Sequence, residues 1–181
     1  SFKIGITGTN GKSTCCYHLH QLLEESQLVG NIGTPVLDNI NSCRYSIIEL
    51  SSFQLEKMKE IQLDLGVLLN ISPDHIDHHG NFAEYKRAKN RIKESKKVTQ
   101  ESDPAKLWSM IVEKPQRAVR DIELKDLPHR YQHITTHNQM IFINDSKATN
   151  LTALKFALKK MSSPYLFCLL YTSDAADEGL G

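Results

Sequence analysis

Short apolar stretches alternate with longer amphipathic stretches along this chain, and the alternation predicts strands followed by helices. Apolar runs at residues 2–6, 45–50 and 63–71 are typical of strands, and the near-continuous apolar character of 63–71 indicates a buried parallel strand. Apolar positions at helical spacing follow the first run over residues 15–23. We therefore predict an α/β fold in which helices flank a parallel sheet.

The remaining pattern is less regular. Further predicted elements are helices over 82–97, 103–114 and 151–161 and strands over 140–143 and 164–167. Between the first helix and residue 45, only Leu28 and Val29 are available for a strand before glycines intervene. We therefore expect the second strand of the sheet to be short or missing.

A glycine-rich loop, GTNGKST at residues 8–14, joins the first predicted strand to the first predicted helix. A bound polyphosphate needs close approach of the backbone, amide donors at a helix start and a mobile cation. Gly8, Gly11 and Lys12 supply these three features. The loop is therefore predicted to bind ATP in a P-loop arrangement.

Two aspects of this loop leave alternatives open. Either Ser13 or Thr14 can supply the hydroxyl ligand that Mg²⁺ requires beside the phosphates. The common pattern has a glycine five residues before Gly11, where this chain has Ile6. An ordinary glycine turn between strand and helix is the competing interpretation.

Carboxylates and imidazoles follow two of the predicted strands. Glu49 comes at the carboxyl end of one strand, where it can hold Mg²⁺ or simply be a surface glutamate. The loop SPDHIDHHG at 72–80 contains three histidines, and a single histidine beside carboxylates and phosphates suits a second Mg²⁺ or Mn²⁺. His75 is the candidate, whereas His78 and His79 are expected to be solvated.

Three charged residues stand out from their surroundings. Most cations of the predicted helix 82–97 are expected to be solvated, but Lys89 follows Tyr85 by one turn and can point partly inward. Asp145 and Lys147 lie where a strand meets a helix, which is a frequent place for ligands. Taken by themselves, the latter two residues are better explained by a capped helix start.

Composition narrows the classes of function. The chain has 181 residues, 40% of them hydrophobic, and a formal net charge of +1, so it lacks the charge imbalance of a nucleic-acid-binding or membrane-surface protein. Its four cysteines form no C-x-x-C pair, which predicts reduced thiols. Without a recognisable signal peptide or membrane span, we expect a cytoplasmic protein.

Several motifs occur in the order found in the Mur ligases, and together they resemble that family. They are GITGTNGKST, GNIGTP, IELSSFQLE, LNISPDHIDHHG, YKRAKNRI, LPHR and INDSKATN. The forms ELSSFQ and NDSKATN are similar to those of members that add D-glutamate. The resemblance implies an ATP-dependent amide-bond ligase of peptidoglycan synthesis. ATP would phosphorylate the carboxylate of UDP-MurNAc-L-Ala, and the amine of D-glutamate would attack the acyl phosphate.

The resemblance also implies roles for individual residues around the nucleotide. The implied nucleotide-binding loop residues are Gly8, Thr9, Asn10, Gly11, Lys12, Ser13 and Thr14. Ser13 and Glu49 would hold a first Mg²⁺, and His75 would hold a second. Lys89 would carry a carbamate derived from CO₂ that helps to position the second metal.

Other positions are implied to contact the substrates. Residues implied to face UDP-MurNAc-L-Ala are Asn31, Ser51 and Phe53. Residues implied to close over the nucleotide and the reacting carboxylate are Arg130, Asp145, Lys147 and Thr149, of which Lys147 is catalytic and Thr149 binds substrate.

The domain organisation follows from where the resemblance holds. Residues 1–126 are expected to be an incomplete ATP-binding central domain, with a deletion within 98–126. Residues 127–167 would begin a Rossmann-like carboxyl-terminal ligase domain, and 168–181 would be a non-native tail. Because the chain starts without Met and lacks the family's uridine-binding domain, we expect it to be a truncated copy of an enzyme that is monomeric when complete.

Two alternatives remain open at this point. The chain can be an inactive nucleotide-binding fragment, because most of two domains is missing. It can also derive from another Mur-type ligase, such as a folylpolyglutamate synthase, although ELSSFQ and NDSKATN argue against this.

Overall fold

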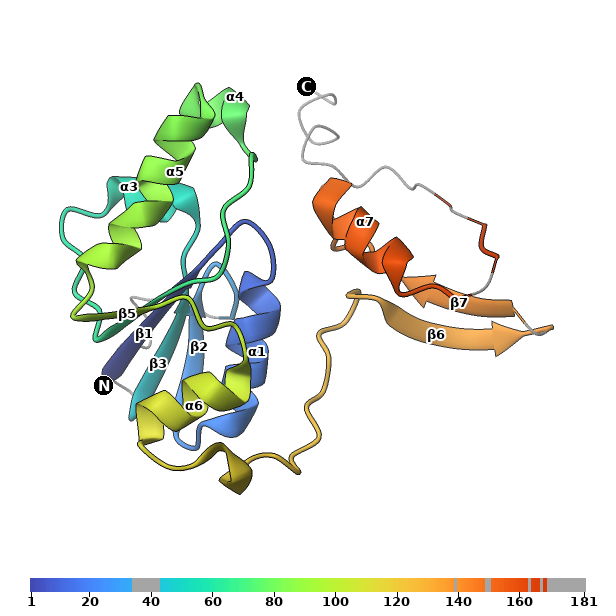
Figure 1. Ribbon diagram of the computed structural model, residues 1–181, viewed down its shortest axis with the longest axis horizontal. Coiled ribbons are helices and arrows are strands. Elements are labelled where there is room, and N and C mark those ends of the chain that lie inside the picture. Colours follow the sequence, from blue (N-terminus) through green and yellow to red (C-terminus); the bar gives the residue numbers. More distant parts are fainter. Residues whose placement is uncertain (34–42, 139, 149–150, 163, 167, 169–181) are drawn as a thin grey trace. The chain divides into compact units, whose positions relative to one another are not determined.

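The chain divides into two compact units. The computed structural model describes residues 1–33, 43–138, 140–148, 151–162, 164–166 and 168 (Figure 1). The first unit runs from Ser1 to Lys125, and the second from Asp126 to Gly181. The first is a parallel sheet flanked by helices, as predicted, and it carries the glycine-rich loop.

Five parallel strands form the sheet of the first unit, in the order β2-β3-β1-β4-β5. They are β1 (Phe2–Thr7), β2 (Ser26–Gly30), β3 (Tyr45–Glu49), β4 (Leu65–Leu68) and β5 (Lys97–Thr99). Strand β1 is central, between β3 and β4. Since the strands are parallel, all their carboxyl ends lie at one edge of the sheet.

The expectation of a short or missing second strand was wrong. All five residues of β2 pair in register with β3, from Ser26 opposite Tyr45 to Gly30 opposite Glu49. Gly30 has φ 101°, and a Cβ atom there would lie 2.4 Å from the backbone oxygen of Glu49. The glycine that interrupts the apolar pattern is therefore required by the close approach of the two strands.

Helices cover both faces of the sheet (Figure 1). Helices α1 (Lys12–Leu22) and α6 (Pro104–Val112) pack together on one face, and α3 (Ser52–Lys57) and α5 (Phe82–Asn90) pack on the other. The sheet has a hydrophobic core on each face. Alternate residues of a strand pack into one or the other, because successive side chains point to opposite faces. Ile47 packs on the α1 side and Ile48 on the α3 side. Shorter helices are α4 (Ile76–His79), η1 (Arg91–Glu94) and η2 (Gln116–Ala118).

The predicted helix 82–97 is shorter than expected. It ends at Asn90, continues as the single 3₁₀ turn η1, and gives way to β5. Ser95 ends the helical turn, since its hydroxyl donates to Ile92 O at 2.6 Å. Arg91, at the end of α5, donates to the backbone oxygens of Leu55 (2.6 Å) and Glu56 (3.2 Å) and so holds the end of α3.

Part of the stretch 98–126 completes the first core. Asp103 caps α6 by accepting from the backbone amides of Ala105 and Lys106, as the predicted helix start requires. Leu107 and Trp108 are buried against α1. This segment is therefore packed structure within the first unit.

The second unit contains a β-hairpin and a helix. Strands β6 (Gln132–His137) and β7 (Met140–Asn144) pair antiparallel, and α7 spans Leu151–Lys159. Strand β7 and helix α7 were predicted, whereas β6 was not. The strand predicted over 164–167 is absent from residues 164–166, and residue 167 lies outside the described part of the chain.

All four cysteines are free thiols: Cys15, Cys16, Cys43 and Cys168. Burial, reinforced by nearby carboxylates, raises the pKa of the Cys15 thiol to about 12. The pKa of Cys16 is also raised well above its usual range, chiefly by burial. These two thiols therefore serve as packing groups of the core. Among the described residues, no helix is both long and apolar enough to cross a membrane.

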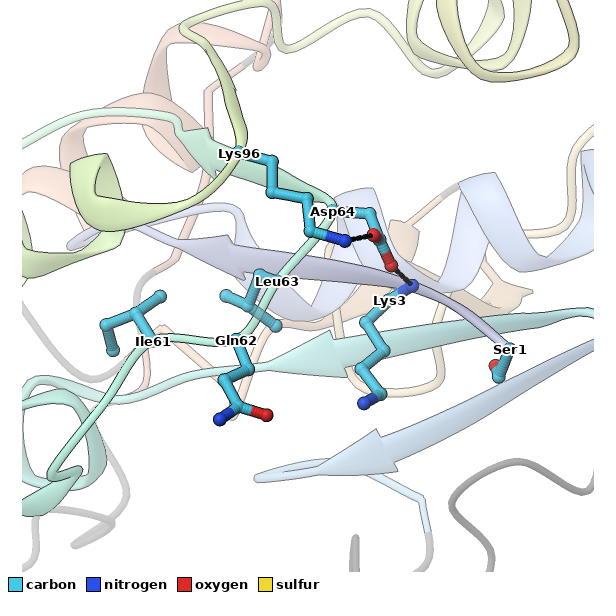
Figure 2. A pocket seen from close by; sticks show the side chains of 7 residues that line it. All are labelled: Ser1, Lys3, Ile61, Gln62, Leu63, Asp64 and Lys96. Atoms are coloured by element: carbon cyan, nitrogen blue, oxygen red, sulfur yellow. Dashed lines mark hydrogen bonds and ion pairs between the residues drawn. The ribbon is translucent and has the colours of Figure 1, made fainter.

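A cavity of about 400 Å³ lies near the amino ends of the strands, away from the glycine-rich loop (Figure 2). Asp64 is its central charge and accepts from the backbone N of Lys3 (2.8 Å) and from Lys96 Nζ (2.7 Å). Burial alone would raise the pKa of Asp64, but these two hydrogen bonds lower it below its ordinary value. A structural ion pair between Asp64 and Lys96 thus lines the cavity, at the edge opposite the predicted site.

Replacing Asp64 with Asn is expected to lower the free energy of unfolding by about 1–2 kcal/mol at pH 7, because one charge-assisted hydrogen bond is lost. A lowered folded-state pKa adds stability above the unfolded pKa, and this stability is lost as pH falls through the folded value. Urea denaturation between pH 7 and pH 2 should therefore show the difference disappearing in acid. Asp121→Asn, at an exposed site, is the control, and an equal loss in both variants would contradict the role of Asp64.

Candidate functional site

Three strand ends meet at the carboxyl edge of the sheet and bring together residues that are far apart in sequence. The backbone passes from β1 into the glycine-rich loop, from β3 through Glu49, and from β4 into residues 69–75. Leu50 N donates to Ile6 O, and Leu69 N donates to Thr7 O, each at 2.9 Å. Parallel pairing thus places the loop between the two segments that carry the predicted metal ligands.

The glycine-rich loop is held open by the segment after β4. Asn10 N donates to Asn70 Oδ1 and Asn70 Nδ2 donates to Asn10 O, both at 2.9 Å, while Thr9 N donates to Asn70 O at 3.0 Å. Asn70 was not predicted as a site residue, although it is a polar residue near the end of the apolar run 63–71. These three bonds fix the loop backbone before any ligand arrives.

The start of α1 has the features of an anion site. Gly11 is its N-cap and has φ 84°, a left-handed conformation that favours glycine. The first turn contains no acidic side chain, so the positive end of the helix dipole is not neutralised there. Lys12 Nζ donates to Gly8 O (2.9 Å) and Thr9 O (3.1 Å), which places the ammonium group on the loop itself.

Glu49 is buried, with 1% of its surface exposed, so the interpretation as a surface glutamate was wrong. Its Oε1 accepts from Asn31 Nδ2 at 3.0 Å, and its backbone oxygen accepts from Asn31 N at 3.1 Å. Oε2 is buried without a hydrogen-bond partner among the residues that the structure describes. A buried carboxylate oxygen left in this state is costly unless a cation completes it, and therefore Glu49 fits a Mg²⁺ ligand.

Lys89 is also buried, with 2% exposed, and not merely turned partly inward. Its Nζ donates to Thr7 Oγ1 at 3.3 Å and lies 5.1 Å from the Tyr85 ring centroid. Thr7 Oγ1 in turn donates to Leu50 O at 2.7 Å. Burial, reinforced by the charge of Lys12, lowers the pKa of Lys89 to about 7. The uncharged form of this amine is therefore accessible near neutral pH.

His75 lies at the start of α4 with a left-handed backbone, φ 48°. Its ring centroid is 5.1 Å from that of Phe53, and its Nε2 is 3.9 Å from Asp74 Oδ2. The side chain is 41% exposed and so remains accessible to a ligand. Phe53 also contacts the rings of His78 (4.4 Å) and His79 (5.4 Å), which makes it the centre of an imidazole cluster.

The expectation that both later histidines are solvated was wrong for His79. Its side chain is 1% exposed, and its Nε2 lies 3.0 Å from Ser52 Oγ. Burial lowers the pKa of His79, with the charge of Glu56 acting in the opposite direction. His78 is 47% exposed, as expected. Loop composition could not reveal that α3 would cover one of two adjacent histidines.

Ser51 and Thr9, both predicted to bind ligands, already have intramolecular partners for their hydroxyl groups. Ser51 caps α3, since its hydroxyl accepts from Gln54 N at 3.2 Å in a capping box. Thr9 Oγ1 lies 2.9 Å from Tyr85 Oη and donates to Ser72 O at 3.1 Å. The predicted ligand roles of both residues stay predictions.

Three predicted site residues come together within the second unit. Tyr131 N donates to Asp145 Oδ1 at 2.9 Å, and Arg130 Nη1 donates to Lys147 O at 3.3 Å. The bond from Arg130 is made to the backbone of Lys147 and not to its ammonium group. Thr149 lies outside the described residues.

A family model described as the Mur ligase middle domain matches residues 6–152. Among curated proteins, the UDP-N-acetylmuramoylalanine–D-glutamate ligase of Wolbachia pipientis is 50% identical over 86 residues, covering 45% of this chain and 17% of that protein. The enzyme of the same name from Zymomonas mobilis is 32% identical over 211 residues, covering 86% of this chain and 48% of that protein.

A third protein of that name, from Pseudothermotoga lettingae, is 28% identical over 231 residues, covering 94% of this chain and 54% of its own length. The chain thus spans about half, or less, of these curated relatives. Among solved structures, the MurF ligase from Thermotoga maritima in complex with ADP matches with a TM-score of 0.43 and 25% identity. That match covers 52% of this chain and 26% of the MurF chain.

Lys89→Met is expected to stabilise the protein by about 1–4 kcal/mol at pH 7, because a buried charge is replaced by an apolar side chain of similar length. Between pH 7 and the ordinary lysine pKa of 10.5, the unfolded wild-type chain binds more protons than the folded one. Wild-type stability should therefore rise over this range, and the advantage of the variant should shrink.

Urea denaturation in CO₂-free buffer from pH 6 to pH 10 measures this difference. Lys93→Met, at an exposed position, is the matched control and should change little at any pH. A pH-independent gap between Lys89→Met and wild type would show that the amine does not titrate in this range.

Proposed function

The chain belongs to the Mur ligase family through its middle domain, and from this we propose that it is the nucleotide-binding part of an ATP-dependent ligase. We further propose that the complete enzyme joins D-glutamate to UDP-N-acetylmuramoyl-L-alanine in peptidoglycan synthesis. Support for this substrate pair comes from the names of the relatives that match the chain. We also propose a cytoplasmic location, since free thiols are typical of cytoplasmic proteins.

One observation carries the proposal. A preformed glycine-rich loop with Lys12 lies at the same sheet edge as two buried groups of opposite charge, Glu49 and Lys89. Phosphoryl transfer relies on positioning and on stabilising the charge that develops on phosphate oxygens. Amide donors, a mobile ammonium group and an unpaired carboxylate oxygen are the groups that this task needs.

The proposed reaction has two steps. The alanyl carboxylate oxygen of the substrate attacks the γ-phosphorus of ATP, and the bond to the bridging oxygen breaks to release ADP. The amine of D-glutamate then attacks the carbonyl carbon of the acyl phosphate. The carbon–oxygen bond breaks, inorganic phosphate leaves, the amine loses a proton, and an amide remains.

Within this reaction, the amides of the loop and Lys12 would bind the phosphates. Ser13 and Glu49 would hold one Mg²⁺ and His75 a second, and these ions would neutralise phosphate charge. Asn31 would keep the Glu49 carboxylate oriented through the bond it already makes. Substrate roles remain proposed for Ser51, Phe53 and Thr149, and roles over the nucleotide remain proposed for Arg130, Asp145 and Lys147.

Lys89 is proposed to form a carbamate. Its uncharged amine would attack the carbon of CO₂, and the loss of one proton would leave an anionic carbamate. The pKa of about 7 supports this step, since only the uncharged amine is nucleophilic. The product would replace a buried cation by a group with oxygen ligands for a hard metal ion.

ATP with Mg²⁺ should raise the unfolding temperature of the chain, because a ligand that binds only the folded state stabilises it, by about 2.7 kcal/mol at 100 times its Kd. Lys12→Ala should abolish most of this shift, while Lys93→Ala should retain it. Differential scanning fluorimetry with and without ATP measures both. An unchanged shift in Lys12→Ala would remove the basis for assigning the loop.

Incubation with ¹³C-labelled bicarbonate at pH 8 should produce a carbamate carbon signal in the NMR spectrum. The signal should be absent in Lys89→Met and present in Lys86→Met, which changes an exposed lysine of the same helix. Equal signals in the two variants would place the carbamate elsewhere, and no signal in wild type would refute it.

A nucleotide-binding fragment without turnover is the second candidate function, because the chain covers about half, or less, of its relatives. Measurement of ADP release distinguishes the ligase from the nucleotide-binding fragment. Release that depends on both D-glutamate and UDP-MurNAc-L-Ala supports the ligase. Nucleotide-induced stabilisation without release supports the fragment.

A further inference from the structure

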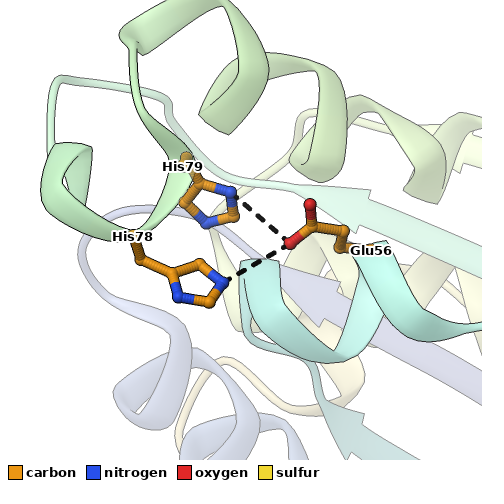
Figure 3. A group of neighbouring side chains, drawn as sticks. All are labelled: Glu56, His78 and His79. Carbon is orange, nitrogen blue, oxygen red and sulfur yellow. Dashed lines mark ion pairs between the residues drawn. The ribbon is translucent and has the colours of Figure 1, made fainter.

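The geometry points to a transition-metal site formed by Glu56, His78 and His79, and we propose that it binds one Zn²⁺ or a similar divalent ion (Figure 3). The three side chains come from two elements, since Glu56 lies in α3 and both histidines lie in α4. Figure 3 shows both imidazoles directed at the same carboxylate. This site is separate from the Mg²⁺ ligands proposed above and does not depend on the ligase assignment.

The two separations between the Glu56 carboxylate and the imidazoles fit one shared ion. Glu56 Oε2 lies 3.6 Å from His78 Nε2 and 3.6 Å from His79 Nδ1. All three donor atoms lie within 4.8 Å of one another. A tetrahedral ion with bonds of about 2.1 Å holds its ligands roughly 3.4 Å apart, which is close to both measured separations. The same separations are too long for direct hydrogen bonds.

One donor atom is left unsatisfied in a buried position. His79 Nδ1 has no hydrogen-bond partner among the described residues, although its side chain is only 1% exposed. Its other ring nitrogen, Nε2, lies 3.0 Å from Ser52 Oγ. If Nε2 donates to that hydroxyl, the lone pair of Nδ1 faces Glu56. An outer partner that fixes the ring in this way is typical of metal-binding histidines.

The protein holds the three ligands in place without the ion. The capping box at Ser51 and the bonds from Arg91 to Leu55 O and Glu56 O fix the two ends of α3. The Phe53 ring contacts the imidazole of His78 edge-on, with centroids 4.4 Å apart. Little rearrangement is therefore needed for binding.

The donor set selects the type of ion. Two imidazoles and one carboxylate suit Zn²⁺, Co²⁺ or Ni²⁺, whereas Mg²⁺ prefers oxygen ligands and retains its water. Three protein ligands leave further coordination positions open, and His78 and Glu56 are exposed enough for water to occupy them. The bound ion would link α3, which follows Glu49, to α4, which begins directly after His75.

Titration of the metal-free 181-residue chain with ZnCl₂, without nucleotide, tests the site by calorimetry. We expect one equivalent to bind with a micromolar or lower Kd, and one equivalent of Co²⁺ to give visible ligand-field absorption. His78→Ala and Glu56→Gln should each weaken binding by more than about tenfold, since even outer partners of metal ligands contribute roughly 10- to 100-fold. Both changes are at exposed positions, which favours intact folding.

Matched controls are His137→Ala and Glu60→Gln, which remove an exposed histidine and an exposed carboxylate elsewhere and should leave the affinity unchanged. The proposal is overturned if wild type binds no Zn²⁺ at a protein concentration of about 50 μM, which is roughly 50 times a micromolar Kd. It is also overturned if His78→Ala and Glu56→Gln bind as tightly as wild type. Should a variant fail to fold, NMR of wild type decides, because Zn²⁺ must shift the ring signals of His78 and His79 and not that of His137.

Discussion

The burial of two opposite charges at one sheet edge is the constraint on which the rest of the site depends. Glu49 and Lys89 are 1% and 2% exposed, and each would be costly in an apolar interior without partners. Asn31 binds one oxygen of the carboxylate, and Thr7 accepts a hydrogen bond from the amine. The partners come from β1 and from the end of β2, so the strand register decides whether both charges can be accommodated.

The pairing of β4 with β1 places Asn70 beside the glycine-rich loop. Asn70 exchanges two hydrogen bonds with Asn10 and accepts a third from Thr9, so the loop backbone is ordered in the free protein. A site built in this way spends little binding energy on ordering itself. The Lys12 ammonium group rests on the carbonyl oxygens of Gly8 and Thr9 within the same loop.

Helix α3, which follows Glu49, contacts the histidines at both ends of α4. Phe53 in α3 contacts the rings of His75, His78 and His79, and Ser52 lies within hydrogen-bond distance of His79. The position of α3 is set at one end by its own capping box and at the other by Arg91 of η1. A change at this helix is therefore expected to affect the segments after both β3 and β4.

Local sequence determined several of the strands and helices and the place of the glycine-rich loop. Strand-like apolar runs, helical spacing and the pattern GTNGKST sufficed to predict a parallel α/β sheet with a phosphate-binding loop before α1, because these signals depend on neighbours along the chain. Only the tertiary structure decided which side chains became buried: Glu49, Lys89 and His79 are shielded by elements distant in sequence. Strand β2 was missed for the same reason, since Gly30 weakens the local pattern yet is required by the backbone of β3. Burial depends on packing between such elements and is not encoded in any single stretch. The pKa of Lys89 depends on it, and so do the atoms of Glu49 and His79 that have no partner among the described residues.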